Sequence, residues 1–193
     1  LMEGTWNMAI QGPVFHEKWF ERLPHLPFGF DGMNLVRYWD LAAKIPYKQT
    51  PDPDWTVGVL IAGPDSGGLY YVAGVVRGQW DAAQGDRQLQ QTATLDGRDV
   101  TVTIPQEPAQ AGKRVVADLV RKLAGFSVQV MPTSKDKITR ARPFASQVNA
   151  GNVRILGGAW AAEYLHELSR FPGSGHADDR VDADRADLLR GRS

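Results

Sequence analysis

Short runs of β-branched and aromatic residues recur along the first two thirds of the chain, and glycine, proline or polar turn formers bound each run. Such runs predict β-strands. The five expected strands cover residues 35–40, 55–62, 69–76, 100–104 and 127–131, and a shorter extended piece covers 153–156. A polar loop and a Gly-rich turn join the first three runs, which predicts an antiparallel meander.

Helical spacing of apolar residues begins after the third expected strand. It is clearest at residues 111–124, where valine and leucine recur at helical spacing between Lys, Arg and Asp. Gly125 follows and predicts the end of that helix. Weaker helical patterns cover 81–94, 160–170, 178–189 and 135–149, the last with a break expected near Pro143.

The order of these elements predicts the fold class. A three-strand meander followed by strands that alternate with helices is typical of an α/β fold with a mixed sheet. An RNase H-like domain has this antiparallel meander plus parallel strands, flanked by helices. Residues 35–193 are expected to form that domain. Residues 1–34 combine frequent Gly and Pro with several aromatic side chains, which predicts an irregular connector or arm packed on the body.

Composition narrows the class of protein. The 22 basic and 22 acidic side chains cancel, which excludes a polycation and an acidic disordered chain. Cysteine is absent, which excludes disulfide scaffolds, thiolate zinc sites and cysteine nucleophiles. No apolar stretch approaches the length of a membrane span, so no membrane partner is expected.

Acidic residues stand where the expected strands end. Asp40 ends the first strand, Glu107 follows the fourth, and Asp178 and Asp179 open the last helix. If the first and fourth strands are neighbours, these carboxylates converge and supply the oxygen ligands that Mg²⁺ or Mn²⁺ needs for phosphodiester hydrolysis. Taken singly, each acid has an ordinary alternative: a turn former, a loop acid, or a helix-capping pair.

Six segments occur in this order along the chain: VRYWDLA (36–42), DWTVG (54–58), PQEPAQAGK (105–113), KITRA (137–141), ELSRFP (167–172) and HADDRVDA (176–183). Together they resemble the C-terminal nuclease domain of the large terminase subunit of tailed bacteriophages. The resemblance covers about residues 35–183.

The resemblance implies an RNase H-like endonuclease that cuts DNA with divalent metal. Two Mg²⁺ or Mn²⁺ ions are expected, held by Asp40, Glu107, Asp179 and its neighbour Asp178, with Asp54 as a weaker candidate. Asp40, Glu107 and Asp179 are the expected catalytic residues. Relatives often carry Asp where this chain has Glu107. Ala177 separates His176 from the acidic pair, which favours a loop or capping role for that histidine over a proton shuttle.

Basic residues cluster around the expected site and are candidates for contacts with DNA phosphates: Lys113, Arg114, Lys135, Lys137, Arg140 and Arg142. For each one, a solvated helix face is the alternative. The chain contains no Gly-x-x-x-x-Gly-Lys-Ser/Thr motif, so it lacks a P-loop. It therefore resembles the nuclease half of a large terminase subunit without the ATPase domain.

The resemblance also implies partners and a place of action. Double-stranded DNA, the terminase ATPase domain, the small terminase subunit and the portal are the expected partners. The expected location is the packaging motor at the procapsid, in the cytoplasm of an infected bacterium. Two other functions stay open: a docking module of the motor with weak catalysis and, on fold analogy alone, a resolvase- or transposase-like enzyme.

Overall fold

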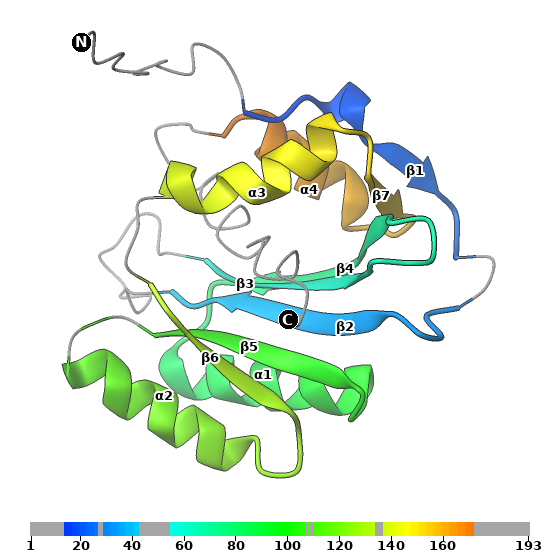
Figure 1. The fold of residues 1–193 in the computed structure, drawn as a ribbon. Coiled ribbons are helices and arrows are strands. Elements are labelled where there is room, and N and C mark those ends of the chain that lie inside the picture. Colours follow the sequence, from blue (N-terminus) through cyan, green and yellow to red (C-terminus); the bar gives the residue numbers. More distant parts are fainter. Residues whose placement is uncertain are drawn as a thin grey trace, which may run out of the picture.

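A seven-stranded mixed sheet forms the centre of the computed structural model, which describes residues 14–26, 29–42, 55–106, 108, 110–133 and 137–171 (Figure 1). In spatial order the strands are β1 (Glu21–Leu23), β7 (Val153–Leu156), β4 (Tyr70–Gly78), β3 (Thr56–Gly63), β2 (Asn34–Asp40), β5 (Val100–Gln106) and β6 (Val128–Pro132).

Strand directions confirm the predicted mixed sheet. β3 is antiparallel to both of its neighbours, β2 and β4, and these three strands are the expected meander. The other four pairings are parallel. β5 lies beside β2 with Tyr38 opposite Thr103, so the first and fourth predicted strands are neighbours. As a result, β2, β4, β5 and β6 all end at the same edge of the sheet.

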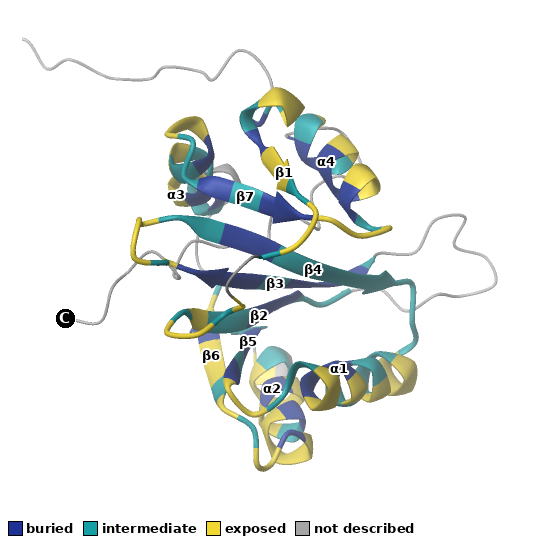
Figure 2. Cartoon of the chain, turned by 90° about the vertical axis from the view of Figure 1, so that its right-hand side faces the viewer, coloured by how far each residue is buried: buried dark blue, intermediate teal, exposed yellow. Residues whose placement is uncertain are grey.

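Among the described residues, helices cover both faces of the sheet (Figure 1). α3 (Lys137–Asn149) and α4 (Ala161–Ser169) pack on one face, and α1 (Ala82–Asp96) and α2 (Gln110–Lys122) pack on the other. Successive strand residues point to opposite faces, so Tyr38 belongs to the first core and Trp39 to the second. The central strands are buried and the outer helix faces are exposed (Figure 2). None of the helices that the structure describes is long and apolar enough to cross a membrane.

Two predictions about local structure are wrong. α3 continues through Pro143 without the expected break. Phe144 and Val148 are buried in the core on this face, and their packing offsets the backbone hydrogen bond that proline cannot make.

The second wrong prediction is the irregular character of residues 17–23. They form a 3-10 turn (Glu17–Trp19) and β1, which pairs with β7. Phe15 and Phe20 are buried in the core. The division into an arm and a domain stays a prediction, and the helix expected at 178–189 lies outside the described residues.

Arg37 links α1 to the middle of the sheet from the α1 side. Its Nε and Nη2 donate to the two carboxylate oxygens of Asp96 at 2.8 and 2.7 Å. Its Nη1 donates to the carbonyl oxygens of Gly58 and Gly74 at 3.2 and 3.1 Å. The side chains of Arg37 and Asp96 are only 5% and 9% exposed, so this ion pair is almost fully removed from water.

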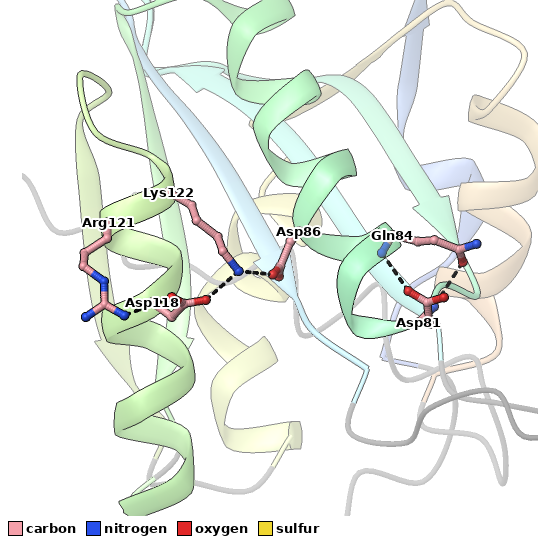
Figure 3. A network of polar contacts seen from close by, with 6 residues as sticks. All are labelled: Asp81, Gln84, Asp86, Asp118, Arg121 and Lys122. Atoms are coloured by element: carbon pink, nitrogen blue, oxygen red, sulfur yellow. Dashed lines mark hydrogen bonds and ion pairs between the residues drawn. The ribbon is translucent and has the colours of Figure 1, made fainter.

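An outer polar network joins α1 to α2 (Figure 3). Lys122 pairs with Asp86 at 2.6 Å and with Asp118 at 2.5 Å, and Arg121 also pairs with Asp118. At the start of α1, Asp81 and Gln84 form a reciprocal capping box that satisfies two backbone N–H groups. The network is exposed to solvent, so it contributes little to stability, whereas removing one partner of the buried Arg37–Asp96 pair costs much more.

Asp65 organises the turn between β3 and β4. It accepts hydrogen bonds from the backbone N–H groups of Gly67 and Leu69 and from the Tyr71 hydroxyl, the last at 2.6 Å. The Tyr71 hydrogen bond is the main cause that lowers the pKa of Asp65. Burial, together with this bond to Asp65, raises the pKa of Tyr71 to about 12.

We expect Tyr71→Phe to destabilise the protein in a pH-dependent way. A lowered carboxyl pKa stabilises the fold above the unfolded pKa of about 4 and is lost as the pH falls further. A raised phenol pKa stabilises the fold below about pH 10 and is lost as the pH rises towards 12. The stability difference between wild type and Tyr71→Phe, measured by urea unfolding, should therefore be greatest from about pH 5 to 9. A pH-independent difference would contradict this.

Candidate metal centre at the end of β2

Asp40 is the last residue of β2 and lies on the face covered by α3 and α4. It is half-buried. Its partner on the neighbouring strand β3 is Val57, and the partner of Val57 on β4 is Arg77. Asp40 shares this face with Tyr38 because alternate strand residues point the same way. The Thr56 hydroxyl accepts a hydrogen bond from the backbone N–H of Ala42 at 3.0 Å, which holds the chain just beyond Asp40.

β5 and β6 end at the same edge and are joined there. The backbone N–H and the hydroxyl of Thr133 both donate to the carbonyl oxygen of Gln106, at 2.9 and 3.2 Å. Gln106 is the last residue of β5, and Glu107 is next in the sequence. On the neighbouring strand, the Tyr38 hydroxyl donates to the Met131 sulfur at 2.9 Å, so β2 and β6 are linked across β5 on this face.

Of the five predicted metal ligands, the structure places one. Asp40 lies at the expected strand end, while Asp54, Glu107, Asp178 and Asp179 lie outside the described residues, as does His176. Within the described part of the chain, no group of three or more His, Asp or Glu side chains could hold a metal ion. The proposed donor set fits Mg²⁺ or Mn²⁺ by its chemistry, since all five residues are carboxylates.

The two helices that carry most of the predicted basic residues start near the same edge, because α2 follows β5 and α3 follows β6 after short connections. Lys113 and Arg114 lie in the first turns of α2 and are exposed. On α3, Arg142 is exposed and Arg140 is half-buried. Lys135 and the side chain of Lys137 lie outside the described residues.

Sequence reasoning missed a cluster around Arg77. Arg77 pairs with Glu163 and, at 2.7 Å, with Glu167, both on α4. Its guanidinium carbon lies 3.6 Å from the centroid of the Trp55 ring. The only sequence signal was a charged residue near the end of an apolar strand, which by itself indicates neither a partner nor a role.

Known proteins with this architecture were found by comparing structures. The nuclease domain of the P22 large terminase superposes with a TM-score of 0.62 at 13% identity, covering 89% of this chain and 88% of that one. The large terminase nuclease of thermophilic phage G20c with bound magnesium gives 0.58 at 15% identity, covering 90% and 95%. The human cytomegalovirus terminase nuclease domain, Mn soaked and inhibitor bound, gives 0.58 at 11% identity, covering 86% and 89%.

These likenesses establish the RNase H-like fold, which the strand order predicted. A comparison with curated proteins finds no match. Residues 37–190, which include most of the chain, match the sequence pattern described as Terminase RNaseH-like domain. The chain therefore belongs to the terminase RNaseH-like domain family.

Proposed function

We propose that this chain is the endonuclease domain of a phage DNA-packaging terminase and that it cuts concatemeric double-stranded DNA when packaging begins and ends. The observation that carries the proposal is the position of Asp40. It ends β2 beside the parallel strand β5, at the edge where the basic first turns of α2 and α3 begin. Family membership and neighbours solved with bound magnesium, cobalt or zinc support the same function.

In this proposal Asp40, Glu107, Asp178 and Asp179, with Asp54 as a weaker candidate, hold two Mg²⁺ or Mn²⁺ ions. When bound, such ions activate a water molecule and neutralise the charge that develops on the scissile phosphate. Asp40 fixes the position of the site at the end of β2. Lys113, Arg114, Lys135, Lys137, Arg140 and Arg142 hold the DNA backbone against the repulsion from these acids.

The direct test is incubation of supercoiled plasmid with the protein in Mn²⁺, in Mg²⁺ or in EDTA. We expect nicked and then linear DNA in at least one of the two metals, with little sequence preference, and intact plasmid in EDTA. Cleavage that persists in EDTA would overturn the metal-dependent mechanism. Intact plasmid in both metals would favour the docking module, in which the domain contacts DNA, the ATPase domain, the small subunit or the portal without cutting.

The DNA-facing role of α2 predicts a change in salt dependence. Replacing Lys113 and Arg114 together by Ala should weaken DNA binding about equally for all sequences. It should also lower the slope of log affinity against log salt by about 2, because each lost phosphate contact releases about one counterion fewer. Fluorescence anisotropy of a labelled duplex over a range of salt concentrations measures both quantities.

Arg121→Ala is the matched control for this double variant. Arg121 is exposed on the same helix but lies in its last turn, about 11 Å further from the site edge. Its replacement should leave the slope unchanged. An equal effect of both variants, or no effect of the double variant, would place the DNA elsewhere.

A further inference from the structure

Arg77 connects two elements at the edge of the sheet where Asp40 lies. Its Nη1 pairs with Glu163 and Glu167 on α4, and its guanidinium group stacks on Trp55, just before β3. The side chain is only 17% exposed. Within the described structure its Nε–H is buried without a hydrogen-bond partner, so the stacked ring and the two carboxylates hold the group in place.

The position of Arg77 relative to Asp40 follows from the strand register. Asp40, Val57 and Arg77 form one row across β2, β3 and β4, and side chains in one row share a face. Two strand spacings separate Asp40 from Arg77, which is about 10 Å. Arg77 therefore lies beside the candidate metal centre, and as a permanent cation without an acceptor atom it does not bind the ion itself.

The partners of Arg77 connect it to the other proposed ligands. Trp55 directly follows Asp54 in the sequence. α4 is the last described helix, and Asp178 comes nine residues after its final residue, Ser169. Arg77 thus joins the sheet that carries Asp40 to the residue next to Asp54 and to the helix that precedes Asp178 and Asp179 in the sequence.

Arginine is suited to this connection for physical reasons. Its planar guanidinium can stack on an indole ring and bind carboxylates in its own plane, whereas a lysine ammonium does neither with the same geometry. The pairing also compensates the charge of Glu167, whose side chain is only 19% exposed. Loss of Arg77 would remove this compensating charge from a partly buried carboxylate on α4.

We propose that Arg77 is a positioning residue for the metal centre: it fixes α4 against the Asp40 end of the sheet, so that the acids that follow α4 can reach the ion held by Asp40. This inference rests on the proposed function. Arg77 does not itself touch metal or DNA. It acts through Glu163, Glu167 and Trp55, so its loss should weaken metal binding and leave the cleavage rate at saturating metal nearly unchanged.

The test compares Arg77→Gln with wild type in two measurements. Mn²⁺ affinity is measured from the free-ion electron paramagnetic resonance signal, and the half-saturating Mn²⁺ concentration is measured for plasmid nicking. In Arg77→Gln we expect the Mn²⁺ affinity to fall about 10-fold and the half-saturating Mn²⁺ concentration to rise by the same factor. This is the usual effect of removing a group that orients metal ligands. Arg77→Lys and Glu167→Gln should give smaller shifts, and they keep the test valid if Arg77→Gln does not fold.

Arg154→Gln is the matched control. Arg154 is a strand arginine that is 20% exposed and pairs with Glu21 at 2.7 Å. It lies opposite Tyr71, near the start of β4, so it is far from the site edge. Both Gln variants should lower the melting temperature in EDTA, but Arg154→Gln should leave Mn²⁺ affinity at the wild-type value.

The outcomes separate this inference from the function on which it rests. If wild type binds Mn²⁺ and cuts DNA while Arg77→Gln binds Mn²⁺ equally well, the positioning role is wrong and the proposed function stands. An equal loss of affinity in Arg154→Gln would also overturn the positioning role, because it would show a general effect of stability. If wild type neither binds Mn²⁺ nor cuts DNA, the proposed function fails and the positioning role fails with it.

Discussion

Asp40→Asn is expected to reduce Mn²⁺-dependent plasmid cleavage about 1,000-fold or more. The substitution keeps the shape of the side chain and removes its negative charge, so one ligand of the proposed centre is lost. The bound ions stabilise the charge of the transition state by several kcal/mol, and they depend on ligands such as Asp40. A loss of about 4 kcal/mol corresponds to a roughly 1,000-fold lower rate. The measurement is the initial rate of nicking at several Mn²⁺ concentrations.

Thermal melting provides an independent measurement on the same variant. An ion that binds only the folded state at 100 times its Kd stabilises wild type by about 2.7 kcal/mol, or roughly 5–10 °C for a domain of this size. Asp40→Asn removes one of several mutually repelling charges, so in EDTA it should melt at or above the wild-type temperature. Its shift on adding Mn²⁺ should be smaller than that of wild type.

Asp99→Asn is the control for both measurements. Asp99 is exposed and directly precedes β5, so it lies at the opposite end of the sheet from Asp40. Its cleavage rate and its Mn²⁺-induced shift should equal those of wild type. If Asp40→Asn also cuts at the full rate and responds equally to Mn²⁺, Asp40 is not a ligand, and the docking function becomes the better explanation.

Arg37→Met is expected to be the most destabilising of the substitutions considered. It leaves the Asp96 carboxylate, only 9% exposed, without its cation, and it leaves the Gly58 and Gly74 carbonyl oxygens without their donor. Breaking a buried ion pair in this way costs about 3–5 kcal/mol. For a protein of this length the melting temperature should fall by roughly 6–20 °C.

The double variant Arg37→Met/Asp96→Leu tests whether the unpaired Asp96 carboxylate causes the loss of stability. When both charges are replaced by apolar groups, no unpaired charge remains, so much of the lost stability should return. Arg121→Ala, which breaks an exposed pair, should change the free energy of unfolding by less than about 1 kcal/mol. A loss below about 1 kcal/mol in Arg37→Met would show that the pair is not important for stability.

Local sequence patterns were sufficient to predict the central sheet. β2 to β6 correspond to runs of β-branched residues, and the order of strands and helices predicted a mixed sheet. The sequence left open whether the first and fourth strands are neighbours, and the structure shows that β2 pairs with β5 in parallel. The same reasoning placed Asp40 at a strand end. β1 could not be predicted, since three residues carry no usable periodicity and its partner strand lies more than 130 residues away in the chain.

The cluster around Arg77 was beyond prediction for a related reason. Its partners Glu163 and Glu167 are 86 and 90 residues away in the sequence. Such pairs depend on how α4 packs on the sheet, and no local pattern encodes that packing. Arg37 and Asp96 are likewise 59 residues apart. Sequence patterns thus located elements and strand ends, whereas the contacts that hold these ends together required the fold.

The pairing of β1 with β7 has a consequence for any attempt to shorten the protein. A chain trimmed to begin at residue 34 would keep every strand of the meander but lose β1, Phe15 and Phe20. The outer backbone groups of β7 would then be unpaired, and an uncovered strand of this kind is a template for pairing with another molecule. We therefore expect β1 to protect this edge of the sheet against self-association, so a shortened version of the domain should retain it.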